Sequence, residues 1–190
     1  MGKIVITEFV SLDGVMEDPG GSEDFKHGGW TFEISRGDEG DRFKLDETTQ
    51  AQSQLLGRRT FEAFAEAWPQ REGDFADRFN EMPKYVVSST LKDPDWQNSH
   101  VLSGDPVEAV SKLREEQDGV ILVAGSAQLV QTLIENDLVD ELRLMVFPVI
   151  LGAGKRLWGE TSDKKSLRLT DSKVVGDGVA IMIYEPVSSE

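Results

Sequence analysis

The stretch Val120–Leu157, VILVAGSAQLVQTLIENDLVDELRLMVFPVILGAGKRL, decides the fold class of this chain. It opens on an apolar run, Val120–Ala124, which breaks at Gly125-Ser126. A segment of helical period follows, and a second apolar run covers Leu142–Leu151. Neither run alternates cleanly between apolar and polar residues, as is typical of parallel strands buried under helices on both faces. The stretch therefore predicts a strand, a tight turn, a helix and a second strand in an α/β protein.

The turn at Gly125-Ser126 is also the first candidate for a ligand site. It places free backbone N–H groups and a helix N-terminus at the carboxyl end of a strand. In an α/β sheet this is where an anion such as a phosphate binds.

The rest of the chain continues this pattern, and we predict one domain over residues 1–190. Further strands are expected at Lys3–Ser11, Lys84–Ser88 and within Trp96–Leu102. Helices are expected over 41–56, from Gly57 to Trp68, and after an Asp cap at 105, with a short helix or turn at 74–82. Gly176-Asp177-Gly178 predicts a C-terminal hairpin, so the sheet is mostly parallel with an antiparallel strand or two at its end. The loop 17–29 is long enough to be a candidate functional loop.

Composition excludes several classes of function. The net charge of −15 argues against nucleic acid and anionic membranes as partners, since both demand a basic surface. The chain has no cysteine and only His27 and His100, so we predict no metal centre. No apolar run approaches the roughly 18–20 residues of a membrane span. The N-terminal MGKIVI runs into a strand rather than a signal peptide, and we expect a cytoplasmic protein.

Familiar nucleophile and nucleotide motifs are absent. The sequence around Ser126 does not supply the Gly-x-Ser-x-Gly elbow of a serine hydrolase. Gly154-Lys155-Arg156 lacks the first glycine and the hydroxyl of a phosphate loop, and Leu157 stands where a dinucleotide fingerprint needs its third glycine.

Three segments able to bind phosphate remain, and each follows an apolar segment. The first is Gly57, Arg58, Arg59 and Thr60, which offers two guanidinium groups at a helix start. The second is Ser88, Ser89 and Thr90, and the third is Gly125, Ser126 and Ala127. Such points align along one edge of a parallel sheet, which suggests a dinucleotide ligand with two or three phosphates. Taken singly, each is also compatible with an ordinary turn or helix start.

These residues match a known family. Leu55–Glu62, LLGRRTFE, resembles the Gly-Arg-x-Thr signature of dihydrofolate reductases, and Val123–Leu129 resembles their second glycine turn. The segments 138–144, 147–149 and 151–157 resemble the reductase domain of the bifunctional riboflavin-biosynthesis deaminase-reductase, as does Ser11-Leu12-Asp13-Gly14. The resemblance spans nearly the whole chain. It implies a three-layer dihydrofolate-reductase-like fold, with a mixed eight-stranded sheet flanked by helices and a C-terminal hairpin.

The resemblance also implies a chemistry, which is hydride transfer from NADPH. Arg58, Arg59 and Thr60 would meet the cofactor phosphates, Ser88 to Thr90 the adenosine 2′-phosphate, and Gly125 to Ala127 the pyrophosphate. Asp13 would lie beside the nicotinamide. A carboxylate on the first helix would hold the substrate ring and assist its protonation, and the spacing before Phe43-Lys44 selects Glu39, with Asp38 adjacent. Both acids are equally compatible with a solvated turn.

The substrate stays open at this level. The second half of the chain favours the riboflavin type, a ribosylamino-pyrimidine such as 5-amino-6-(5-phosphoribosylamino)uracil. Dihydrofolate and a non-catalytic nucleotide-binding dimerisation module are the alternatives. The basic candidates near Asp13 are Lys26, His27, Arg36 and Arg42, and they are scattered among many carboxylates, a poor match to phosphate recognition. A homodimer is expected from the resemblance alone.

Overall fold

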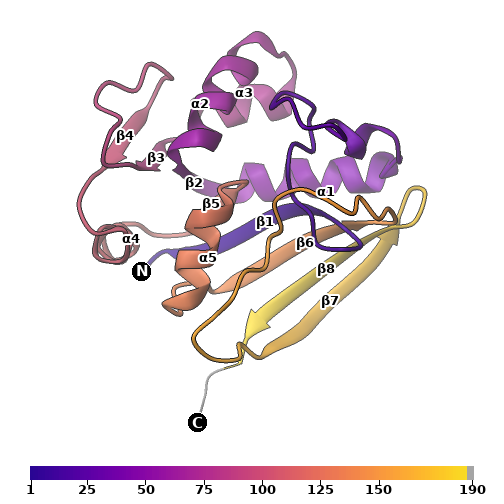
Figure 1. Cartoon of the computed structure of the whole chain (residues 1–190). Helices are drawn as coiled ribbons and strands as arrows, with labels where there is room; N and C mark the ends of the chain where they lie inside the picture. Colours follow the sequence, from indigo (N-terminus) through magenta and orange to yellow (C-terminus); the bar gives the residue numbers. More distant parts are fainter. Residues whose placement is uncertain (188–190) are drawn as a thin grey trace.

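The computed structural model describes residues 1–187, and its eight strands form a single mixed sheet (Figure 1). The strands are β1 (Lys3–Ser11), β2 (Ala51–Gly57), β3 (Lys84–Val87), β4 (Ser99–Leu102), β5 (Val120–Ala124), β6 (Glu141–Phe147), β7 (Leu167–Val175) and β8 (Val179–Pro186). Their order is β4-β3-β2-β5-β1-β6-β8-β7. The pairs from β4 to β6 are parallel, and β8 pairs antiparallel with both β6 and β7. The predicted fold class is confirmed, including the hairpin around Gly176.

Five α-helices and two 3₁₀ turns connect the strands. They are η1 (Trp30–Phe32), α1 (Gly37–Gln50), α2 (Arg58–Ala67), η2 (Trp68–Gln70), α3 (Asp74–Glu81), α4 (Pro106–Glu116) and α5 (Ala127–Glu135). The predicted cap of α4 is present: the Asp105 carboxylate accepts hydrogen bonds from the N–H groups of Val107 and Glu108, each at 3.0 Å. Among residues 1–187, no helix combines the length and apolar character needed to cross a bilayer.

Helices cover both faces of the sheet, which gives three layers. On one face, Val110 of α4 and Leu133 of α5 pack in a cluster with β1 and β5. On the other face, Phe61 of α2 and Phe79 of α3 pack against β2 and β3. A third cluster around Trp30 fills the space between α1 and the antiparallel strands. The alternation of β1 serves both faces, because Ile4 and Ile6 enter the first cluster and Val5 the second.

One predicted element is wrong. The helix expected over 41–56 begins earlier, at Gly37, and ends at Gln50, and Ala51–Gly57 is the strand β2. Polar residues hide this strand in the sequence, since Ser53 and Gln54 are fully buried in it. Gln54 Nε2 donates to the carbonyl oxygen of Phe79 at 2.9 Å, whereas Gln54 Oε1 and Ser53 Oγ have no hydrogen-bond partner among residues 1–187. These buried polar side chains mask the apolar signature of a central strand.

A buried lysine anchors β3 beneath α3. Lys84 is fully buried, and its ammonium donates to the carbonyl oxygens of Asn80 at 2.6 Å, Met82 at 2.8 Å and Gln97 at 3.1 Å. It also lies over the ring of Trp96, 4.2 Å from the ring centroid. Burial lowers the pKa of the Lys84 ammonium from about 10.5 to about 8.

Stability should therefore rise with pH above 8. Between pH 8 and 10.5 the unfolded chain holds a proton on Lys84 that the folded protein has released. The free energy of unfolding gains up to about 1.4 kcal/mol per pH unit from this group. Denaturant unfolding at pH 8, 9 and 10 should show a smaller slope in Lys84→Met than in wild type, whereas Lys92→Met, at an exposed position, keeps the wild-type slope. Equal slopes in all three proteins would contradict the assignment.

Candidate functional site

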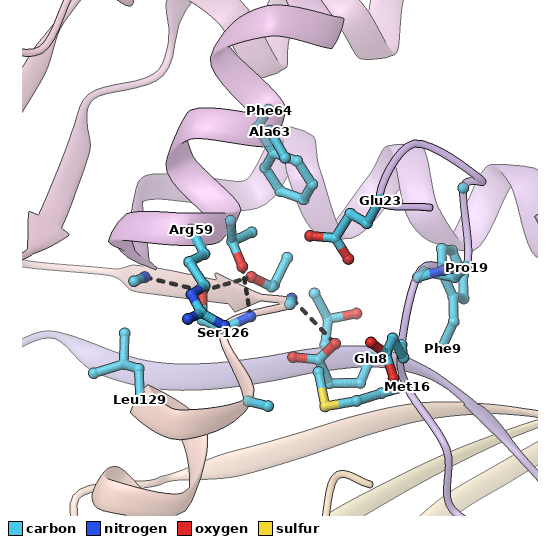
Figure 2. A pocket seen from close by; sticks show the side chains of 18 of the residues that line it. Glu8, Phe9, Met16, Pro19, Glu23, Arg59, Ala63, Phe64, Ser126 and Leu129 are labelled. Atoms are coloured by element: carbon cyan, nitrogen blue, oxygen red, sulfur yellow. Dashed lines mark hydrogen bonds between the residues drawn. The ribbon is translucent and has the colours of Figure 1, made fainter. Parts of the chain in front are cut away.

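A cleft of about 1240 Å³ opens at the carboxyl ends of the parallel strands (Figure 2). It forms where β5 stops while β1 continues. The pairing of β1 with β5 ends at Thr7 opposite Ala124, but its pairing with β6 runs on to Ser11 opposite Phe147. The segment of β1 from Glu8 onward therefore has a free side, beside the Gly125-Ser126 turn. This is the place in an open α/β sheet where ligands bind.

The three segments able to bind phosphate meet along this edge. They follow β2, β3 and β5, which are neighbouring parallel strands. All ten residues predicted to bind the cofactor line the cleft, namely Gly57, Arg58, Arg59, Thr60, Ser88, Ser89, Thr90, Gly125, Ser126 and Ala127. The structure thus brings together what the sequence placed far apart. Their role in binding a cofactor stays a prediction.

Hydroxyl groups lock two of the segments to each other. The Ser126 N–H donates to Thr60 Oγ1 at 2.8 Å, and Ser126 Oγ accepts from the Gly57 N–H at 2.9 Å. Ser126 has a left-handed backbone with φ of 59°, and so does Gly125. A Cβ added to Gly125 would lie 2.8 Å from Thr60 Cγ2, so only glycine allows the turn to approach α2 this closely. Ser126 Oγ also donates to the Ala124 carbonyl oxygen at 3.2 Å, whereas Thr60 Oγ1 acts only as an acceptor in this contact. Both hydroxyl groups therefore shape the edge, and Thr60 keeps its hydroxyl proton for a ligand.

The groups in the cleft that could bind an anion are backbone N–H groups and guanidinium groups. The first N–H groups of α2 and α5 have no partners within their helices, and both helices begin at the cleft. Arg58 is paired with Glu62 at 3.1 Å, one turn further along α2. Figure 2 shows the Arg59 side chain at the cleft beside Ser126. Arg59 is therefore the stronger of the two anion-binding candidates.

The third segment is a compact turn. Ser88 Oγ accepts hydrogen bonds from the N–H groups of Thr90 at 3.2 Å and Leu91 at 3.0 Å. Ser89 and Thr90 are exposed beside it. The Ser88 hydroxyl thus holds the turn that presents its two neighbours to the cleft.

Glu8, which sequence reasoning did not select, lies at the floor of the cleft near Met16 (Figure 2). Glu8 is only 5% exposed to solvent, and its Oε2 accepts a hydrogen bond from the Gly125 N–H at 3.1 Å. Burial raises the pKa of the Glu8 carboxyl well above its usual range, with the Lys44 cation partly opposing this shift. The available signal was the polar pair Thr7-Glu8, which interrupts an apolar strand.

A second buried carboxylate lies just beneath this floor. Glu47, in the last turn of α1, forms an ion pair with Lys44 and accepts from Thr7 Oγ1 at 2.8 Å. Lys44 also donates to Thr7 Oγ1 at 2.8 Å, and Arg143 Nη1 lies 3.7 Å from Glu47 Oε2. Lys44 and Thr7 line the cleft. The floor is thus a connected polar network inserted between apolar clusters.

The predicted catalytic acids Asp38 and Glu39 lie away from the cleft, and their catalytic role stays an untested prediction. Both lie in the first turn of α1 and are exposed, and neither lines the cleft. Glu39 pairs with Lys173 of β7 at 2.9 Å, across the solvent-facing side of the sheet end. The buried carboxylate of the first helix is instead Glu47. Because α1 begins at Gly37, the two acids fall at its N-terminus, where carboxylates are stabilised by the helix dipole.

Asp13 is not among the residues that line the cleft, and its place beside the nicotinamide stays a prediction. Its carboxylate accepts from Ser11 Oγ at 2.6 Å and from the N–H groups of Leu151 at 3.1 Å and Gly152 at 2.8 Å. These hydrogen bonds, the one from Ser11 foremost, lower the pKa of Asp13 to about 2. Arg156 adds a hydrogen bond to the Asp13 carbonyl oxygen. Asp13 therefore joins the end of β1 to the segment after β6.

The long loop before α1 forms one wall of the cleft, through Glu17–Gly20, Ser22 and Glu23. Buried Asp18 holds the loop by accepting from the Ser22 N–H at 2.6 Å, and the Trp30 indole donates to the Glu17 carbonyl oxygen at 2.9 Å. Of the four basic candidates near Asp13, Arg36 lines the cleft and pairs with Asp41 at 2.6 Å. Within residues 1–187, no three His, Asp or Glu side chains are grouped so as to hold a metal ion.

A family model describing the RibD C-terminal domain matches residues 2–181. The chain belongs to the RibD C-terminal domain family. This places it in a family of riboflavin-pathway reductase type, as the sequence resemblance predicted.

The sequence relatives come from Bacillus subtilis (strain 168). The uncharacterized protein YyaP is 28% identical over 187 residues, covering 96% of this chain and 94% of YyaP. The uncharacterized protein YwjB is 30% identical over 182 residues, covering 94% of this chain and 95% of YwjB. Both therefore match this chain along almost their whole length.

Solved structures show the same fold. A putative riboflavin biosynthesis protein from Shewanella sp. PV-4 superposes with a TM-score of 0.78 at 20% identity, over 98% of this chain and 99% of that one. A pyrimidine reductase-like protein from Corynebacterium diphtheriae gives 0.68 at 15% identity, over 99% and 93%. Dihydrofolate reductase from Enterococcus faecalis, complexed with NADP(H) and RAB-propyl, gives 0.58 at 16% identity, over 98% of both chains. The fold is dihydrofolate-reductase-like.

Asp13→Asn should weaken the fold and leave the cleft intact. The neutral amide binds the two backbone N–H groups less strongly, which costs about 1 kcal/mol of unfolding free energy at pH 7. The contribution of this carboxylate is present above about pH 4 and is lost as pH falls through about 2. Denaturant midpoints at pH 7 and pH 3 should therefore differ less in the variant than in wild type. A loss of nucleotide affinity with unchanged stability would contradict this assignment.

Proposed function

We propose that this protein is an NADPH-dependent reductase that transfers hydride to a small heterocyclic or ribosylamino-pyrimidine substrate. The proposed activity resembles that of a 5-amino-6-(5-phosphoribosylamino)uracil reductase. One observation carries the proposal: three segments able to bind phosphate, from neighbouring parallel strands, line the same cleft as a buried carboxyl group. NADPH would supply the hydride. The chain's own groups would bind the cofactor, orient the substrate and donate a proton to it.

The cleft fits a dinucleotide in size and donor chemistry. Its volume of about 1240 Å³ exceeds the range of about 300–1000 Å³ usual for drug-sized ligands. We propose that Gly125, Ser126 and Ala127 form the pyrophosphate end of the cleft. The N–H groups of Gly125 and Ser126 already bind Glu8 and Thr60, so the donors to the phosphate would be the first N–H groups of α5, beginning with that of Ala127. Arg58, Arg59 and Thr60 would hold cofactor phosphate, and Ser88, Ser89 and Thr90 would form the end for the adenosine 2′-phosphate.

The substrate would occupy the other half of the cleft, between Glu8 and the loop 17–23. Phe9, Met16, Phe64 and Trp68 supply apolar and aromatic surface there, which suits a flat heterocyclic ring. Lys155 and Arg156 also line the cleft, and they are candidates for binding a substrate phosphate. The family membership favours a riboflavin-type substrate over dihydrofolate. A homodimer remains a prediction from the same resemblance, and a cytoplasmic location remains a prediction from the sequence.

NADPH should quench or shift the tryptophan fluorescence on binding. Two of the four tryptophans, Trp68 and Trp158, line the cleft and would report an occupied site. We expect saturable binding at tens of micromolar NADPH or below, with NADH weaker because it lacks the 2′-phosphate dianion. No response to either nucleotide would refute the reductase proposal. Saturable binding without oxidation of NADPH by either substrate type would favour the non-catalytic module.

Arg59→Ala should weaken NADPH binding more than Arg58→Ala does, because Glu62 already engages Arg58. Loss of a charge-assisted hydrogen bond to phosphate costs about 1.5–3 kcal/mol, or roughly 10- to 150-fold in Kd. Lys112→Ala is the matched control, since it removes one exposed positive charge from α4 outside the cleft. If all three variants lose affinity equally, the effect is one of net charge and not of a phosphate contact.

A further inference from the structure

The Glu8 carboxyl group has one satisfied oxygen and one that is not. Oε2 accepts from the Gly125 N–H at 3.1 Å. Oε1 is buried and finds no hydrogen-bond partner among residues 1–187. Glu47 Oε2 and four other buried side-chain atoms share this lack of a partner, but of these six residues Glu8 is the one that lines the cleft. Buried polar atoms in folded proteins nearly always have a partner, and an exception calls for an explanation. Here the residue forms part of the cleft wall, so a bound molecule is in a position to supply the partner.

The charged side chains around Glu8 form ion pairs with residues other than Glu8. Lys44 on α1 is the cation that lowers the pKa of Glu8, but it pairs with Glu47 and donates to Thr7. Arg143 on β6 reaches Glu47 and Glu141, the latter at 2.5 Å. Glu47 itself adds negative charge, and Glu17 on the loop contributes another carboxylate to the cleft. Among residues 1–187, Glu8 thus forms no ion pair, and burial raises the pKa of its carboxyl group, which favours the protonated form.

We propose that Glu8 is the proton donor of the reaction: its carboxyl group protonates the nitrogen or oxygen of a neutral C=N or C=O group in the substrate. This deepens the function proposed above and rests on it. The position suits the role, because the hydrogen bond to Gly125 ties the acid to the cofactor edge of the cleft. Met16 and the loop 17–23 bound its other side, where the substrate would lie.

The step balances without any further reagent. The substrate carbon accepts the hydride, with its electron pair, from the reduced nicotinamide, which becomes oxidised. The π pair of the C=N or C=O bond moves to the heteroatom, which takes the proton of Glu8. The remaining carboxylate regains a proton from water after the products leave. The Gly125 N–H stabilises that carboxylate in the interval, since it already binds Oε2.

The role proposed for Glu8 also restricts the chemical class of the substrate. Negative charge develops on the heteroatom during hydride addition, so an ionised carboxylate at this wall would oppose the reaction and a protonated one assists it. The group next to Glu8 should therefore be an uncharged carbonyl or imine. Any phosphate of the substrate would lie at the far side of the compartment, near Lys155 and Arg156.

Infrared spectroscopy of Glu8→Gln tests the protonation directly. The amide oxygen of glutamine can still accept from the Gly125 N–H, so the fold and the cofactor edge should be retained. At pH 7 the wild-type protein should show the C=O stretch of a protonated carboxylic acid, which disappears in Glu8→Gln and persists in Glu116→Gln, an exposed site on α4. Absence of the band in wild type, with NADPH binding intact, overturns the role of Glu8 alone.

Kinetics test the proton transfer. The probes are 5-amino-6-(5-phosphoribosylamino)uracil and dihydrofolate, each with NADPH. For the probe that wild type reduces, Glu8→Gln should lower kcat by about 10²- to 10⁴-fold with little change in KM or in the Kd for NADPH. The wild-type kcat should fall as pH rises through the Glu8 pKa, and the variant should lack that decline. A rate within a few-fold of wild type with the same pH profile would make Glu8 a structural residue. Failure of wild type to bind NADPH, or to reduce either probe, overturns the proposed function and the donor role together.

Discussion

Three hydrogen bonds from one turn hold the cleft together. The Gly125 N–H reaches Glu8 on β1, the Ser126 N–H reaches Thr60 on α2, and Ser126 Oγ receives the Gly57 N–H at the end of β2. These bonds join the ends of three neighbouring strands at one corner. They require a left-handed backbone at both Gly125 and Ser126, a conformation that costs free energy at a serine. The geometry of the site follows from this junction rather than from any single helix.

The junction also separates the cleft into two parts with different chemical groups. On one side it offers N–H groups and the Arg59 guanidinium, in a protein whose net charge is −15. In such an acidic protein, these donors are a local source of positive charge for an anion. On the other side the junction ends at Glu8, a carboxyl group that forms no ion pair among residues 1–187. Lys44 and Glu47 neutralise each other below the floor, which leaves the electrostatics of the substrate half to Glu8 and the loop before α1.

Local patterns in the sequence were enough to predict the parallel sheet, the hairpin, the cap of α4 and the three segments that meet at the cleft. Each of these depends on a short run of residues, such as Gly125-Ser126 or Asp105-Pro106. The strand β2 was missed because Ser53 and Gln54 are buried with polar side chains, which removes the apolar signature. Glu8 was missed because its burial depends on where β5 ends, more than a hundred positions away. The exposed position of Asp38 and Glu39 could not be foreseen, because the start of α1 could not be fixed in a segment rich in glycine and acidic residues.

The position of β5 in the sheet has a consequence for how the molecule is assembled. β5 lies between β1 and β2, although both precede it in the chain by more than sixty residues. During synthesis β1 and β2 emerge before β5, the strand that lies between them in the sheet. The centre of the sheet can therefore form only after residue 124 has been synthesised. Contacts of such large sequence separation close slowly, because loop entropy is lost before they form. The binding cleft is therefore among the last parts of the molecule to appear, and a nascent chain that stops before β5 cannot contain it.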